Sequence, residues 1–258
     1  MFTKKFDFAQ LRKRRILCLG IGGGSDAISA FVCAQILKDI AVDIAYGNTK
    51  LNGNKDICLL STHIGYVKSC EVPITKVRHG TTDIDSSLSR GSHHSPLIFL
   101  LDKQNPDIIE QLAREIIDLN HFDFIIGVDT GGDALKTKNA AKSRDVMMLK
   151  VLRATKLDSM LFVLGMASDG ISPHKLKPRL KNLCSSNSYL GYFPLAPYQN
   201  MLNRCSLGLA ASRTPKIILS ALDSSSKEIK VKRGGYYTVQ REWLVNGFVF
   251  NVNGVLQK

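Results

Sequence analysis

The stretch RILCLGIGGGSDAISA, residues 15–30, decides the fold. Arg15–Gly20 is a short apolar run bounded by turn residues, which is typical of a buried β-strand. Three consecutive glycines and Asp26 follow this run, and Ala27–Asp39 has a helical pattern. A strand that enters a helix through a glycine-rich turn is a building unit of α/β proteins.

The same alternation continues along the chain. Further apolar runs indicate buried strands at Val42–Tyr46, Leu97–Leu101, Phe124–Val128 and Leu161–Gly165. Helical patterns cover Asp107–Leu119 and Asp145–Thr155. The chain therefore predicts an α/β fold: three layers with a mostly parallel, Rossmann-like sheet that helices cover on both faces.

The remaining segments complete a single α/β domain over residues 1–258, since no linker divides the chain. Residues 1–14 form a basic N-terminal lead. Residues 172–203 are rich in Pro, Ser and Asn, which indicates a loop or lid insertion with short helices. PKIILSAL, residues 215–222, has the composition of a later strand. IKVKRGGYYTVQRE, residues 229–242, predicts a C-terminal β-hairpin that turns at Gly234 and Gly235.

Two glycine-rich loops resemble each other. GIGGGSDA begins at Gly20 and GVDTGGDA begins at Gly127, so Asp26 and Asp133 occupy the same place after their strands. A third strand runs into MASDG, which carries Asp169. In open α/β sheets, ligands bind outside the carboxyl ends of parallel strands. If these three strands are neighbours, Asp26, Asp129, Asp133 and Asp169 converge at one edge, where a hydrogen-bond donor, a cation or shifted pKa values must compensate their charges.

The glycines have their own chemistry. Gly22, Gly23 and Gly24 permit close backbone approach, and their N–H groups next to a helix start form an anion site. The spacing disfavours a dinucleotide site, because Ser25 stands where a third glycine belongs and no acid ends the second strand. No Gly-Lys-Ser/Thr follows, so a P-loop is also disfavoured. A loop that holds a diphosphate fits best.

The polar residues around these loops also have structural explanations. Asp26 at a helix start would cap unpaired N–H groups, and the recurrence at Asp133 makes a functional role equally well supported. Asp145 is interpreted as an N-cap or first-turn acid of its helix. Arg144 would reach a phosphate or pair with a carboxylate. The loop acids offer oxygen ligands, so Mg²⁺ stays open although no cofactor is required, and the lack of histidine disfavours zinc.

Charge and cysteine content limit the partners. The net charge is +13, with basic clusters at 12–15, 175–181 and 230–233, which attract anionic ligands or form a solvated surface. Few aromatic residues interleave them, so nucleic acid is not favoured. None of the six cysteines forms a CxxC pair, and no signal peptide or membrane span is expected. These features predict a cytoplasmic protein.

The motifs GIGGGSDA and DTGGDAL, with Ser-Arg-Asp after the second, resemble those of an uncharacterised bacterial and archaeal family of unknown function, over most of the chain from about Arg15. The chain also resembles ADP-ribosylhydrolases that intracellular bacterial pathogens deliver into host cells, described as atypical macrodomains. This second resemblance implies a macrodomain-like fold, a bacterial effector, binding of ADP-ribose and its removal from arginine of a modified protein.

The loops and the resemblance together define a candidate site. Asp26, Asp129 and Asp133 are the candidate catalytic acids. The candidate ligand-binding residues share the strand-end loops and their flanks: Gly22, Gly23, Gly24, Ser25, Thr130, Gly131, Gly132, Arg144, Ser168 and Asp169. Two alternatives remain: a non-catalytic module for a nucleotide or ADP-ribose, and a metal-dependent phosphoryl or glycosyl transfer enzyme.

Overall fold

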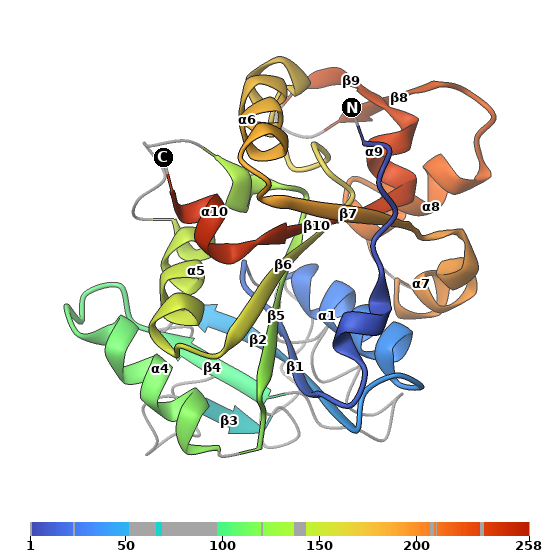
Figure 1. Cartoon of the computed structure of the whole chain (residues 1–258). Coiled ribbons are helices and arrows are strands. Elements are labelled where there is room, and N and C mark those ends of the chain that lie inside the picture. The colour runs from blue at the N-terminus through green and yellow to red at the C-terminus, as the bar shows by residue number, and fades with distance from the viewer. Residues whose placement is uncertain are drawn as a thin grey trace.

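The computed structural model describes residues 2–22, 24–51, 66–68, 97–119, 121–136, 143–206, 209, 211–232 and 235–257. Within these residues the centre is an eight-stranded sheet in the order β3-β4-β2-β1-β5-β6-β10-β7 (Figure 1). Its strands are β1 (Arg15–Gly20), β2 (Asp43–Leu51), β3 (Tyr66–Lys68), β4 (Leu97–Leu101), β5 (Phe124–Thr130), β6 (Asp158–Leu164), β7 (Tyr189–Pro194) and β10 (Asn246–Asn251).

Helices and short 3₁₀ turns connect these strands. The helices are α1 (Asp26–Leu37), α4 (Ile108–Asp118), α5 (Arg144–Ala154), α6 (Pro173–Ser185), α7 (Gln199–Cys205), α8 (Thr214–Asp223), α9 (Arg241–Val245) and α10 (Val252–Leu256). The 3₁₀ turns are η1 (Phe8–Leu11), η3 (Asp133–Leu135) and η5 (Ala196–Tyr198). Strands β8 (Glu228–Lys232) and β9 (Tyr236–Gln240) pair as a separate antiparallel hairpin.

The sheet is mixed but mostly parallel. Strands β4, β2, β1, β5 and β6 are parallel neighbours, whereas β3 and β10 run antiparallel to the strands beside them. Strand β7 is antiparallel to β10 and therefore runs in the direction of β6. The predicted α/β class and the five predicted strands are confirmed, as are the three predicted helices.

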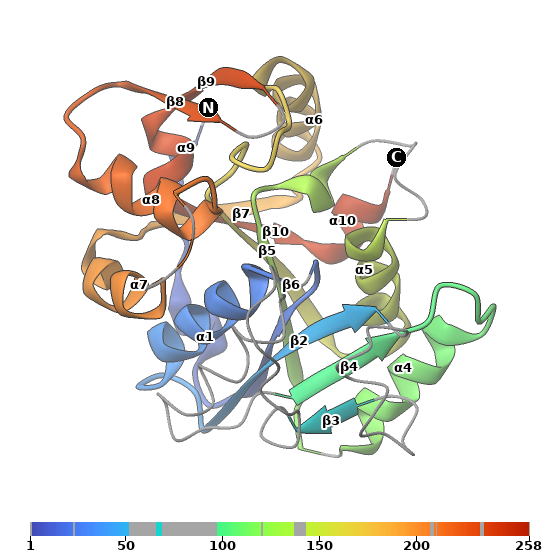
Figure 2. The same ribbon diagram turned by 180° about the vertical axis from the view of Figure 1, so that it is seen from behind.

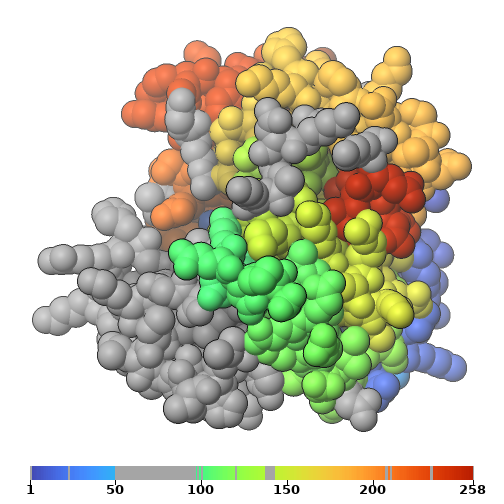
Figure 3. All heavy atoms as spheres, turned by 90° about the vertical axis from the view of Figure 1, so that its left-hand side faces the viewer, coloured from blue at the N-terminus to red at the C-terminus, as the bar shows by residue number. Residues whose placement is uncertain are grey.

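Alternate residues of the central strands β1, β5 and β6 are buried on opposite faces of the sheet, which gives two cores. On one face Ile16 and Cys18 of β1 pack with α1, α7 and α8 (Figure 2). On the other face Leu17 and Leu19 pack with α4, α5, α6 and α10. Figure 3 shows α4, α5 and α10 side by side on this second face. Because alternate residues of β1 point to opposite faces, the strand packs against helices on both sides of the sheet.

Residues 215–222 correct the sequence analysis, because they form helix α8 and not a strand. Pro215 stands in the first helical turn, where its missing N–H costs nothing and its fixed φ favours the helix. Ile217, Ile218 and Ala221 are buried at helical spacing. A short apolar run alone does not distinguish a buried strand from a buried helix.

Residues 172–203 differ from the expected loop or lid with short helices, because α6 has 13 residues and β7 is a strand of the central sheet. Leu176, Leu180 and Leu183 bury one side of α6 at helical spacing despite Pro178 within the helix. Polar residues on the exposed side gave this segment its loop-like composition. The predicted hairpin at 229–242 is confirmed, with Gly235 in its turn and Gly234 outside the described residues.

The N-terminal lead packs onto the sheet. Phe6 donates its N–H to the carbonyl of Tyr192 at 2.8 Å, and Tyr192 returns a bond to the carbonyl of Lys4 at 3.0 Å. Gly191 allows this approach, because a Cβ there would lie 2.7 Å from the N and Cα atoms of Phe6. The lead therefore covers the exposed edge of β7. No helix within the described ranges is long and apolar enough to cross a membrane.

Candidate active site

The three acid-bearing loops meet at the carboxyl ends of adjacent parallel strands. Strand β5 pairs with β1 on one side and with β6 on the other. From β1 the chain moves outward to β2 and then returns to the opposite side of β1 at β5. The connections therefore diverge between β1 and β5, which is where open α/β sheets bind ligands. The adjacency expected for these three strands is confirmed.

The carboxyl group of Asp26 links two of these loops. Its Oδ2 accepts the N–H of Gly22 at 2.5 Å, and its Oδ1 accepts the N–H of Thr130 at 3.1 Å. The side chain is buried, with 4% exposed. Asp26 is the first residue of α1, yet these two bonds go to the loops and not to the helix. The carboxylate occupies the place that sequence analysis gave to a phosphate at Gly22.

Asp129 lies at the end of β5 and is 1% exposed. Its Oδ2 accepts the N–H of Ala134 at 2.9 Å. Its Oδ1 is buried and has no hydrogen-bond partner among the described residues. The hydroxyl of Thr130 is likewise buried without a hydrogen-bond partner among the described residues. A buried polar atom without a hydrogen bond lowers the stability of the folded state by about 1–3 kcal/mol. A ligand or a water molecule that bonds these two atoms would remove this cost.

Asp145 belongs to the same cluster, although sequence analysis treated it as a helix-start acid. A Cβ on Gly22 would come within 2.2 Å of Oδ1 of Asp145 and within 2.6 Å of Oδ2 of Asp26. The absence of a side chain at Gly22 thus lets the carboxyl groups of Asp26 and Asp145 both approach the same backbone segment. Asp145 was not among the predicted site residues, although the Arg-Asp pair after the second glycine-rich loop is a signal that could have indicated it.

The charges of these groups act on one another. Burial raises the pKa of Asp26 well above its usual range, and the charges of Asp145 and Asp133 raise it further. Burial likewise raises the pKa of Asp129, with added repulsion from Asp133, Asp26 and Asp145. Burial and the charge of Asp133 raise the pKa of Asp145 to about 6, although nearby Arg144 opposes this.

Two cations partly balance the cluster. Lys136 pairs with Asp133 at 3.2 Å, and the Asp133 side chain is 24% exposed. The charge of Arg144 lowers the pKa of both Asp26 and Asp145, and its buried Nε has no bonded partner within the described ranges. Among the described residues, four carboxyl groups face two cations, so this part of the site carries an excess of negative charge when ionised.

The remaining candidates surround this centre. Gly131 and Gly132 have φ values of +122° and +92°, and a Cβ on Gly131 would lie 2.3 Å from Cβ of Asp169. Asp169 therefore packs against the β5 loop as expected. Ser168 is buried and donates its hydroxyl to Thr214 at 2.9 Å, so this hydroxyl is engaged within the protein.

The loop after β1 contains the last candidates. Ser25 is buried and stands at the start of α1, but its side chain makes no capping bond. Gly24 adopts a φ of +60°, which glycine tolerates without strain. Gly23 lies outside the described residues. Among the residues that the structure describes, no group of three or more His, Cys, Asp or Glu side chains is arranged to hold a metal ion.

A family model described as a protein of unknown function (DUF1152) matches residues 17–257. This match spans nearly the whole chain, so the protein belongs to that family. No curated protein matches the chain.

Proposed function

We propose that this member of the DUF1152 family is an ADP-ribosylhydrolase that binds ADP-ribose attached to arginine and hydrolyses the bond between ribose and guanidinium. One observation carries the proposal: Asp26, Asp129, Asp133 and Asp145 are gathered where the chain diverges between β1 and β5, and Oδ1 of Asp129 is left without a bonded partner in the described part of the chain. The proposal includes a macrodomain-like relationship for the fold.

The reaction breaks the bond between C1 of ribose and a guanidinium nitrogen, and water supplies the oxygen that replaces it. The water loses a proton to a carboxylate, and the leaving guanidine gains a proton. The transition state has oxocarbenium character, which nearby carboxylates stabilise. A carboxyl group with a raised pKa is a better base than an ordinary aspartate.

The hydrogen bonds divide the roles. Both oxygens of Asp26 are held by backbone N–H groups, which suits a positioning residue. Asp129 keeps one oxygen available, and we assign it to the attacking water or a ribose hydroxyl. Asp133, which pairs with Lys136, is more exposed than Asp129. We therefore assign Asp133 to contact with the arginine leaving group.

The charge of the site favours this substrate over a purely anionic one. An excess of carboxylates attracts a guanidinium, which pairs with two oxygens at once. The diphosphate then needs donors away from Asp26, because the N–H of Gly22 is already engaged. The guanidinium of Arg144 and the backbone around Gly24 and Gly132 are the candidates.

The test compares the unmodified protein with Asp129→Asn on a protein carrying ADP-ribosyl-arginine, with release of ADP-ribose as the readout. Release should fall by about 100-fold or more, as expected when a general base is lost. Calorimetry should still detect ADP-ribose binding to the variant. Asp118→Asn, on the exposed end of α4, is the matched control and should release ADP-ribose at the unmodified rate.

Other outcomes contradict the proposal. Binding of ADP-ribose with no release by the unmodified protein identifies a binding module. Activity that a chelator abolishes and Mg²⁺ restores identifies metal-dependent transfer. Equal release by the unmodified protein and Asp129→Asn removes Asp129 from the mechanism.

A further inference from the structure

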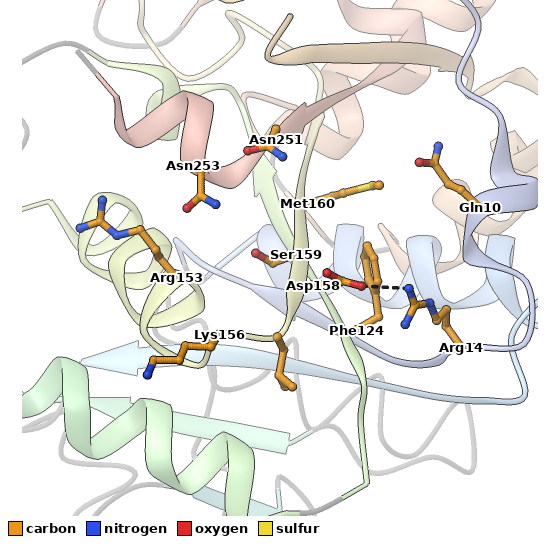
Figure 4. A pocket seen from close by; sticks show the side chains of 11 residues that line it. Gln10, Arg14, Phe124, Arg153, Lys156, Asp158, Ser159, Met160, Asn251 and Asn253 are labelled. Atoms are coloured by element: carbon orange, nitrogen blue, oxygen red, sulfur yellow. Dashed lines mark hydrogen bonds and ion pairs between the residues drawn. The ribbon is translucent and has the colours of Figure 1, made fainter.

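A cavity of about 430 Å³ lies at the opposite end of the sheet from the aspartates. It opens between the starts of β5 and β6, the end of α5 and the junction of β10 with α10 (Figure 4). Strand β5 begins beside it at Phe124 and ends at Thr130 in the candidate active site. Six strand steps separate these residues by roughly 20 Å. The two sites are therefore distinct.

The charged lining of this cavity is mainly basic. Arg14, Arg153 and Lys156 line it, against one acid, Asp158. Arg14 donates to Asp158 at 2.9 Å, and its guanidinium lies 5.8 Å from the centroid of the Phe124 ring. The ion pair with Arg14 neutralises Asp158, the one acid among the described lining residues. Figure 4 shows Arg153 and Lys156 together on the other side, where they give the cavity its positive excess.

Neutral polar groups complete the lining. Asn251 and Asn253 lie above the two cations in Figure 4. Oδ1 of Asn251 accepts the N–H of Gly254 at 3.1 Å, so its amide NH₂ is the group left for a ligand. Phe124 and Met160 are buried and form an apolar part of the wall. Cations, amide donors and a small apolar area are the combination that orients a small organic anion.

We propose that this cavity binds a small organic anion, with its charged group between Arg153 and Lys156 and its polar groups toward Asn251 and Asn253. The volume is within the range of small-molecule sites, roughly 300–1,000 Å³. Phosphate and carboxylate share the chemistry that the two cations recognise. This inference does not depend on the proposed hydrolase activity.

Calorimetry of the full chain with glycerol 3-phosphate, inorganic phosphate and succinate tests the proposal. Arg153→Gln/Lys156→Gln should weaken binding of the preferred anion at least about tenfold, because two charge-assisted hydrogen bonds are lost. Lys177→Gln/Lys181→Gln removes the same charge from the exposed side of α6 and should retain the affinity. Comparison of the phosphates with succinate identifies the charged group.

Two results would overturn the inference. The first is no binding of any of the three probes at millimolar concentration. The second is equal weakening by both double variants, which indicates general charge attraction. Asp129→Asn distinguishes this site from the active site, because it should lose hydrolysis and keep the affinity for glycerol 3-phosphate. Circular dichroism confirms that each variant is folded.

Discussion

The carboxyl group of Asp26 accepts the backbone N–H of Thr130 at 3.1 Å, across 104 residues of sequence. The first residue of α1 is thereby joined to the last residue of β5. Because the same carboxyl group also accepts the N–H of Gly22, two loops that converge on the site are held by one side chain. The geometry of the site therefore depends on a side chain with two acceptor oxygens at position 26.

Asp26→Asn should destabilise the protein. Asparagine presents one acceptor oxygen, so either the Gly22 or the Thr130 N–H would face an NH₂ group instead. An unsatisfied buried donor costs about 1–3 kcal/mol. The free energy of unfolding from urea denaturation measures this loss, and hydrolysis should fall as well.

Asp129→Asn is the matched control for that experiment. Here one oxygen already has its donor and the other has none in the described ranges, so an amide keeps the Ala134 bond and removes a buried charge. Its stability at neutral pH should equal or exceed that of the unmodified protein. Equal destabilisation by both substitutions would show that charge, and not the count of acceptors, sets the cost at Asp26.

The contribution of Asp145 to the free energy of unfolding should fall as the pH rises from about 4 to about 6. Burial and the charge of Asp133 raise the pKa of Asp145 to about 6, so the folded chain retains a proton that the unfolded chain has lost. Ionisation of Asp145 in the folded state then lowers stability, on the order of 1–3 kcal/mol. Below this window the penalty disappears, because both states are protonated.

Asp145→Asn should remove this part of the pH dependence. In urea denaturation, the free energy of unfolding of Asp145→Asn should increase relative to that of the unmodified protein as the pH rises from 4 to 6. Asp118→Asn, an exposed acid on α4, should leave the dependence unchanged. A constant difference between the Asp145→Asn and unmodified proteins across this window would contradict the raised pKa.

Gly22→Ala should disturb the site with little backbone strain, because Gly22 is not among the residues with positive φ. The added methyl group would come within 2.2 Å of Asp145 and 2.6 Å of Asp26, so both carboxyl groups must move. A displacement of about 1 Å at a catalytic site costs roughly 100-fold in rate. Measurement of ADP-ribose release checks this, and an unchanged rate would exclude both carboxyl groups from catalysis.

Gly191→Ala should detach the N-terminal lead from β7. Gly191 has φ +148°, and the new Cβ would lie 2.7 Å from the backbone of Phe6. Amide hydrogen exchange at Phe6 and Tyr192 should accelerate in this variant. Exchange that stays as slow as in the unmodified protein would contradict the steric argument.

Gly235→Ala separates this steric effect from backbone strain. Gly235 has φ +147°, almost the value at Gly191, but a Cβ there meets no described atom within 4 Å. This variant should cost only the strain of the left-handed backbone, about 1–2 kcal/mol. The exchange rates of the lead should be unaffected.

The sequence predicted the central sheet because β1, β5 and β6 carry continuous apolar runs between turn residues. Helix α8 was mistaken for a strand because eight apolar-rich residues fit either structure, and only packing against the sheet decided between them. The place of these acids at strand ends predicted that Asp26, Asp129, Asp133 and Asp169 converge if the three strands are parallel neighbours, and the repeated offset of Asp26 and Asp133 supported a functional role. This offset lies within a few residues of each strand end, so it can be recognised in the sequence without knowledge of the tertiary contacts.

Asp145 could not be recognised in the same way. Its approach to Gly22 depends on how α5 packs against β5, and a first-turn acid is common in helices of every function. The amide bonds of Asp26 were equally hidden, because a helix-start aspartate usually bonds its own helix. The sequence therefore revealed which loops meet, but the division of roles among the acids required their hydrogen bonds.

The place of β10 in the sheet has a consequence for synthesis. In the chain this strand follows β7 only after α7, α8, the hairpin of β8 and β9, and α9, yet it lies between β6 and β7 in the sheet. Until the ribosome has delivered it, β6 keeps an unpaired edge and β7, with the lead from the first residues, has no strand to join. Open edges are templates for aggregation. The nascent chain must therefore be protected until residues 246–251 have been made, and deletion of this strand would leave the sheet in two unjoined parts.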